Sequence, residues 1–136
     1  MRRLLIWVCG AGVTLFAAIQ FVPSAHTNPP VEFDAEWDSP RTRDLFYRAC
    51  ADCHSHETKW PWFSKVAPAS WLIANHVREG RRDMNVSVPD EVDVTEAVAQ
   101  IRNNRMPPAD YRLLHSDARL DEAEKADLIS GLKKTF

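Results

Sequence analysis

The sequence begins with an apolar stretch that is longer than the apolar segments of a typical water-soluble domain. Residues Leu4 to Val22 (LLIWVCGAGVTLFAAIQFV) run for nineteen residues without a charge. At the rise of an α-helix, such a run covers roughly 28 Å, which is about the thickness of a bilayer's hydrocarbon core. The run therefore predicts a transmembrane helix, and only the rest of the chain remains to fold in water.

The charges around this run predict its orientation. Arg2 and Arg3 precede it, and the first charge after it is Glu32. By the positive-inside tendency, the N-terminus stays in the cytoplasm and the remainder reaches the periplasm or the outside. A cleaved signal peptide is the alternative, and it would leave a soluble periplasmic protein. Pro23-Ser24-Ala25 is a poor cleavage site because of its proline, so an uncleaved anchor over residues 1–25 is favoured.

The remainder divides into a tether and one domain. Residues 26–39 are rich in proline, acid and small polar residues, which is typical of an extended linker. Residues 40–136 are enough for one modest hydrophobic core. After residue 25 the chain has 15 basic and 19 acidic residues. This mild acidity gives no reason to expect nucleic-acid binding, which needs a clustered basic face.

The domain is predicted to be all-α. Ser39 and Pro40 form a helix start, because serine caps and proline suits the first helical position. Asp121 and Glu124 match a capping box for the last helix, and Gly80 is expected to stop an earlier one. No convincing strand alternation is present. The expected helices cover about residues 40–50, 70–79 and 93–103 and begin again at 121, with a loop over 60–68.

A C-x-x-C-H motif lies at the end of the first of these helices, as Cys50-Ala51-Asp52-Cys53-His54. This spacing is the attachment pattern of c-type haem. Two thiols three positions apart can reach the two vinyl groups on one porphyrin edge, and the next histidine can turn toward the iron. The motif predicts one covalent haem c, bound through Cys50 and Cys53 and ligated by His54.

Two other uses of these cysteines are weaker. A zinc site could combine the motif with His56, but no second C-x-x-C or H-x-x-x-H completes a tetrahedral set. A thioredoxin-like redox pair needs a βαβ context that the sequence lacks. Cys9 lies inside the apolar run and is interpreted as a small buried residue of the membrane helix.

Beyond the motif the sequence resembles the small bacterial haem-binding domain family, whose members are exported single-haem c-type proteins. The resemblance lies in CADCHSHETKWPWFSKVAPASWLIANHVREGRRDMNVS and RMPPADYRLLHSDARLDEAEKADLISGLKK and covers about residues 40–134. It includes the Trp60-Pro61-Trp62 loop and the Ser70-Trp71 helix. The resemblance implies haem binding. More broadly, the arrangement is similar to class I cytochromes c.

Met106 is the predicted sixth iron ligand. It lies in a loop before Pro107 and Pro108, whose fixed φ angles stiffen the chain, and it lies 52 positions beyond His54. His76 is the main rival, since it lies among apolar helix positions. Such a histidine more often donates a hydrogen bond, for example to a haem propionate. Weaker candidates are Met84, which lies beside charged residues, and His56 and His115, which are expected to be partly exposed.

Other side chains are candidates for the haem surroundings. Aromatic residues at Trp60, Trp62 and Trp71 would line the haem pocket or pack in the core, and with a haem present these two roles nearly merge. The arginines of the second helix could pair with propionates, but a solvated helix end is the favoured interpretation. They are Arg78, Arg81 and Arg82.

One-electron transfer is the predicted function, with redox proteins of unknown identity as partners. No general base or nucleophile can be identified, so enzymatic turnover is not required. Two alternatives remain open. If Met106 does not bind, a five-coordinate iron could react with peroxide or bind a gas. The domain could also be a haem subunit of a larger membrane redox complex.

Overall fold

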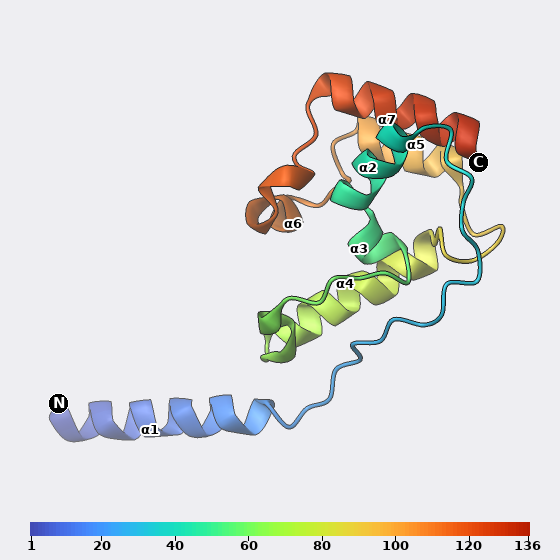
Figure 1. The fold of residues 1–136 in the computed structure, drawn as a ribbon. Coiled ribbons are helices and arrows are strands. Elements are labelled where there is room, and N and C mark those ends of the chain that lie inside the picture. Colours follow the sequence, from blue (N-terminus) through green and yellow to red (C-terminus); the bar gives the residue numbers. More distant parts are fainter. The chain divides into compact units, whose positions relative to one another are not determined.

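The computed structural model describes residues 1–136 and contains only helices and loops (Figure 1). The predicted all-α fold is therefore confirmed. The chain forms two compact units, residues 1–27 with 60–76 and residues 28–59 with 77–136. The elements are α1 (Arg2–Ile19), α2 (Pro40–Ala49), α3 (Ala51–His54), the 3₁₀ turn η1 (Trp62–Lys65), α4 (Ala69–Asp83), α5 (Val94–Arg102), α6 (Ala109–Leu114), the 3₁₀ turn η2 (Ser116–Ala118) and α7 (Glu122–Thr135).

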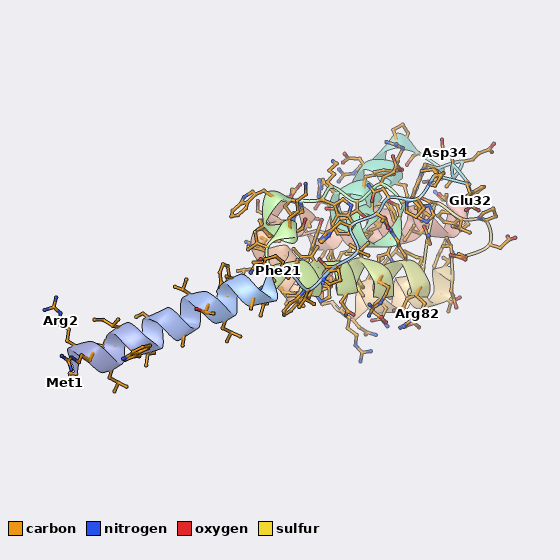
Figure 2. All side chains as sticks on the ribbon, turned by 90° about the horizontal axis from the view of Figure 1, so that it is seen from below. Met1, Arg2, Phe21, Glu32, Asp34 and Arg82 are labelled. Carbon is orange, nitrogen blue, oxygen red and sulfur yellow. The ribbon has the colours of Figure 1, made fainter.

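Helix α1 belongs to the first unit and is long and apolar enough to cross a membrane. None of its residues is buried against protein, and Figure 2 shows its side chains projecting around the helix. After the helix, the side chain of Gln20 pairs with the backbone of Ala67, accepting at 2.9 Å and donating at 3.2 Å. The indole of Trp71 donates to the Val22 carbonyl at 3.4 Å. These bonds join the end of α1 to the segment around η1 within this unit.

The hydrophobic core of the second unit lies between α2, α5 and α7. Leu45 and Phe46 of α2 are fully buried, and Leu128 and Leu132 of α7 pack in the same cluster with Ile101 of α5. Apolar residues at helical spacing supply these faces, as expected for amphipathic helices. The cluster also contains Ala51 of the C-x-x-C-H motif, so the core positions the motif directly.

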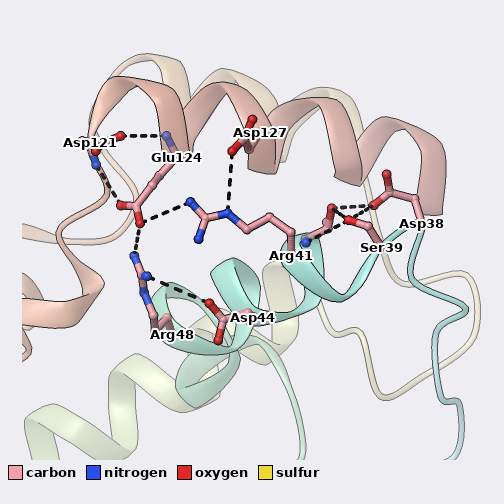
Figure 3. Close-up of polar contacts among 9 residues, drawn as sticks. Asp38, Ser39, Arg41, Asp44, Arg48, Asp121, Glu124 and Asp127 are labelled. Atoms are coloured by element: carbon pink, nitrogen blue, oxygen red, sulfur yellow. Dashed lines mark hydrogen bonds and ion pairs between the residues drawn. The ribbon is translucent and has the colours of Figure 1, made fainter.

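Polar contacts fix the ends of α2 and α7 and join the two helices (Figure 3). Ser39 caps α2 with Pro40 at its first position, and Asp121 and Glu124 form the predicted capping box of α7. The guanidinium of Arg48 reaches Glu124 at 2.8 Å. Both predicted helix starts are confirmed.

The segment before α2 has no helix, but its second half contacts the domain. The amides of Glu32 and Phe33 donate to the Ser87 carbonyl at 2.9 and 3.0 Å. The Asp38 amide donates to the Thr135 hydroxyl at 3.1 Å, across 97 positions of the sequence. Residues 28–38 therefore lie along the second unit, while the boundaries assigned to the tether remain a prediction.

Two helix predictions were wrong in part. Helix α4 continues through Gly80 to Asp83, so this glycine does not end it. The short helix α6 was not predicted, and the loop over residues 60–68 contains the turn η1. Helix α5, capped by Asp93, lies within the expected range.

Helices α2 and α7 approach so closely that Gly131 has no room for a side chain. A Cβ built there would lie 2.0 Å from Thr42 Oγ1 and 2.7 Å from Thr42 Cβ. Glycine is normally unfavourable inside a helix, so its presence here is explained by this contact.

We predict that Gly131→Ala lowers the free energy of unfolding by about 1–3 kcal/mol, because α7 must move away from α2. Chemical denaturation of the purified chain measures this loss. Ser130→Ala on the exposed side of the same helix is the control and should change stability by no more than about 0.5 kcal/mol. Equal stability of Gly131→Ala and the native chain would contradict the close approach.

Candidate cofactor site

The C-x-x-C-H motif occupies a kink between α2 and α3. Helix α2 ends at Ala49, and Cys50 has φ −129° and ψ −36°, outside regular helix geometry. The Cys50 carbonyl then accepts hydrogen bonds from the amides of Cys53 at 3.1 Å and His54 at 3.0 Å. This single turn brings the two cysteines and the histidine together on one short segment, and both thiols are free.

Burial keeps these thiols protonated. Burial raises the pKa of Cys50 to about 12 and that of Cys53 to about 11, and the Asp52 carboxylate adds to the second shift. Zinc binding and disulfide exchange both require the thiolate. The structure also shows no group of three or more His, Cys, Asp or Glu side chains arranged to hold a metal ion. The raised pKa values favour the neutral form of both thiols.

His54 is oriented by the backbone after α4. Its side chain is 9% exposed, and Nδ1 lies 3.0 Å from the Met84 carbonyl oxygen. A carbonyl only accepts, so the proton sits on Nδ1 and the lone pair remains on Nε2. Burial lowers the pKa of His54, although the Met84 and Gly80 carbonyls oppose this shift. The result is a neutral imidazole ready to bind a metal through Nε2.

Gly80 allows α4 to contact the motif backbone. A Cβ at this position would lie 2.6 Å from the Cys53 carbonyl oxygen and 2.9 Å from Cys53 Cβ. These neighbours are backbone and Cβ atoms, which cannot rotate away. The glycine that was expected to stop a helix is instead needed for packing near the end of one.

The residues that follow α4 hold the end of the motif. The Val86 amide donates to the His54 carbonyl at 3.0 Å, and the Ser87 hydroxyl accepts from the His56 amide at 2.9 Å. His56 is 8% exposed, and its two ring nitrogens contact the Pro30 carbonyl and the Asn85 side-chain amide. The expectation that His56 is partly exposed was therefore wrong. It is a structural residue with both nitrogens in use.

Arg81 also supports the motif. Its guanidinium donates to the Ser55 carbonyl at 2.8 Å and to the Thr58 hydroxyl at 2.9 Å. The interpretation of this arginine as part of a solvated helix end was therefore wrong. Arg78 and Arg82 do fit that interpretation, since both are exposed and pair with Glu79 on their own helix.

Asp52, between the two cysteines, connects three parts of the unit. One carboxylate oxygen accepts from the Lys59 amide at 2.9 Å, and the other accepts from the Tyr111 hydroxyl at 2.8 Å. Its carbonyl accepts from the Thr58 hydroxyl at 2.7 Å. Burial and the Asp52 carboxylate raise the pKa of Tyr111, so the phenol stays protonated and donates.

Met106 belongs to the same unit as the motif, in the loop between α5 and α6. It is half-buried and followed by the buried Pro107. Of the weaker candidates, His115 is half-buried and stacks on Tyr111 with ring centroids 4.0 Å apart. Met84 is half-buried and packs against the core.

The other candidate residues lie in the first unit. Trp60 contacts His26 edge-on with ring centroids 4.8 Å apart, Trp62 is 80% exposed, and His76 is half-buried on α4. The indole of Trp71 is bonded to the Val22 carbonyl of the same unit. Their role toward a cofactor stays a prediction.

A comparison with protein-family models matched the haem-binding domain over residues 14–134. The chain belongs to the haem-binding domain family. Neither the curated proteins nor the solved structures that were searched gave a match. This family membership makes the chain a haem-binding protein, as the sequence resemblance implied.

The residues of the motif fit such a cofactor. A haem offers an iron for one neutral imidazole and two vinyl carbons for two thiols, and this donor set is present on one helical turn. The sequence alone predicted these three residues, but it gave no sign of the supporting Met84 carbonyl or Tyr111.

We predict that Gly80→Ala lowers the fraction of purified protein that carries haem, because the new methyl group displaces Cys53 from its place beside His54. The displacement should also cost about 1–3 kcal/mol of stability. Absorbance of the haem relative to protein measures the fraction. Arg78→Ala, at an exposed position of the same helix, should load haem normally. Full haem loading of Gly80→Ala would show that the contact is not required.

Proposed function

We propose that this protein is a mono-haem c-type cytochrome that transfers single electrons at the outer face of the cytoplasmic membrane. The observation that carries the proposal is the set of Cys50, Cys53 and His54 on one turn, with the buried His54 held by a carbonyl at Nδ1, in a chain of the haem-binding domain family. When bound, the haem supplies an iron that accepts and releases one electron.

Cys50 and Cys53 would hold the haem through two thioether bonds. Each thiol would add across one vinyl group, so that a carbon–sulfur bond would form, the vinyl double bond would become single, and the thiol proton would move to the other vinyl carbon. This addition consumes no oxidant or reductant. The high pKa of both thiols is consistent with cysteines that end as neutral thioethers.

His54 would be the proximal iron ligand through Nε2. Metal-binding histidines commonly donate their other ring N–H to a carbonyl, which fixes the ring orientation and strengthens the ligand. The 3.0 Å contact between His54 Nδ1 and Met84 has this form. The Val86 amide bonded to the His54 carbonyl further limits rotation of the turn.

Met106 would be the sixth ligand. Its thioether needs no deprotonation, and methionine ligation raises the reduction potential relative to a second histidine. Its place in the same unit as the motif, with the buried Pro107 next to it in the chain, supports this assignment, and His76 is the rival ligand. With His54 and Met106 both bound to the iron, no coordination position would remain for a substrate, and the haem would supply one-electron transfer.

Helix α1 would keep this carrier at the membrane. It is the one helix long and apolar enough to span a bilayer, and Arg2 and Arg3 at its start favour a cytoplasmic N-terminus. Covalent haem attachment belongs outside the cytoplasm, which agrees with this orientation. Redox proteins in or near the same membrane would then be the partners.

We predict that the double substitution Cys50→Ala with Cys53→Ala removes all haem that survives denaturation and acid–acetone extraction, because no thioether can form. Haem detection after denaturing electrophoresis measures this loss. Cys9→Ala is the matched control, since Cys9 lies exposed on α1, and it should keep its covalent haem. Native protein that loses its pigment on denaturation would refute covalent attachment.

We predict that Met106→Ala converts the iron to a high-spin form that binds carbon monoxide and has a lower reduction potential. Met84→Ala is the control, because it keeps the carbonyl that contacts His54 while removing another half-buried thioether. Absorption spectra of the reduced proteins with and without carbon monoxide make the comparison. Rapid binding by the native protein would favour a peroxidase-like or gas-binding function, and an unchanged Met106→Ala spectrum would favour His76 as the ligand.

A further inference from the structure

The loop that carries Met106 is attached firmly at its start. The amides of Arg105 and Met106 both donate to the Gln100 carbonyl of α5, at 3.0 and 3.3 Å. Asn104 turns the chain with a φ of 56°, and its side chain accepts from Lys125 of α7. Left-handed φ values are tolerated by asparagine, so the turn is built into the sequence. This end of the loop moves only if α5 moves.

The far end of the loop has no comparable support within its own helix. Helix α6 begins three residues after Met106, is six residues long and contains no fully buried residue. Its two leucines at the end are exposed, Leu113 at 74% and Leu114 at 68%. Helices this short are unstable in isolation, so α6 depends on contacts elsewhere.

Tyr111 provides one such contact, in addition to the bond from Arg119 to the Arg112 carbonyl. Its hydroxyl donates to Asp52 at 2.8 Å, and its ring stacks on His115 at 4.0 Å with an interplanar angle of 13°. Asp52 lies between Cys50 and Cys53 and is itself fixed by the Lys59 amide. The bond between Tyr111 and Asp52 therefore ties the Met106 segment to the same turn that presents His54.

We propose that Tyr111 is a positioning residue for the sixth iron ligand, and that its hydrogen bond to Asp52 holds Met106 against the face opposite His54. The inference rests on the proposed function, because it takes Met106 as that ligand. The two axial ligands come from segments 52 positions apart. The hydrogen bond from Tyr111 to Asp52 links these two segments at the cysteine turn, and it limits how far the loop that carries Met106 can move away from that turn.

The expected effect of losing the link is weaker methionine ligation with intact attachment. The Tyr111 hydrogen bond stabilises the state with methionine on the iron relative to the state with imidazole bound. Loss of a hydrogen bond to a charged group changes the equilibrium constant between two such states about tenfold or more. Tyr111→Phe removes only the hydroxyl and keeps the stacked ring. It should therefore raise the apparent affinity of the ferric protein for added imidazole about tenfold.

The experiment uses the full-length haem-loaded protein and measures imidazole affinity, reduction potential and the absorption band of methionine-ligated ferric haem. Tyr111→Phe should bind imidazole more tightly and have a lower potential, while haem still survives denaturation. Asp52→Ala should have a similar effect, and adding Tyr111→Phe to it should cause no further change. Asp52→Asn keeps a hydrogen-bond acceptor for the Tyr111 hydroxyl, so its imidazole affinity and reduction potential should stay close to those of the native protein.

Tyr47→Phe is the matched control, because the Tyr47 hydroxyl also donates to a carboxylate, that of Glu57, without touching the cysteine turn. It should leave imidazole affinity and potential unchanged. Native affinity in Tyr111→Phe, or an equal change in Tyr47→Phe, would overturn the inference while leaving methionine ligation intact. Native protein without a methionine-ligated spectrum would instead overturn the assignment of Met106, so the two failures are distinguishable.

Discussion

The structure depends on how a four-residue helix is held in place. Helix α3 is too short to define its own geometry, because a single helical turn gains one hydrogen bond for several fixed dihedral angles. Its orientation comes from outside, through the contact of Cys53 with Gly80 and the bonds of His54 with Met84 and Val86. The chemistry of the motif is therefore a property of the surrounding fold as much as of five consecutive residues.

These supports come from two sides. The end of α4 and the segment after it fix the backbone and the imidazole, while Arg81 fixes the residues just beyond the motif. On the other side, Ala51 is part of the hydrophobic core, which places the turn against α2 and its neighbours. A buried polar group is costly unless it is bonded, and here nearly every polar group near the turn has a partner. Such a network restricts the turn to one geometry.

The sequence predicted those features whose signals are local. Ser39, Asp121 and Glu124 indicate helix starts, because capping involves residues only three positions apart. The C-x-x-C-H motif indicates a haem, because its spacing is set by the chemistry of haem attachment. Gly80 was misinterpreted, since a glycine that ends a helix and one that admits a neighbour look alike in sequence. The burial of His56 and the bond of Tyr111 to Asp52 depend on residues 29 and 59 positions away, and no local pattern encodes them.

The contact between the segment before α2 and the end of α7 affects the order in which the domain folds. The Asp38 amide and the Thr135 hydroxyl are 97 positions apart, and Trp37 and Phe136 meet edge-on beside them. Contacts between such distant residues form late, because the entropy of closing a long loop must be overcome before they stabilise the fold. Leu45 and Phe46 of α2 have no apolar partner from α7 until the whole segment between them has been synthesised. The apolar face of α2 should thus be completed only when α7 is present, and a growing chain stopped before α7 would leave Leu45 and Phe46 without their α7 partners.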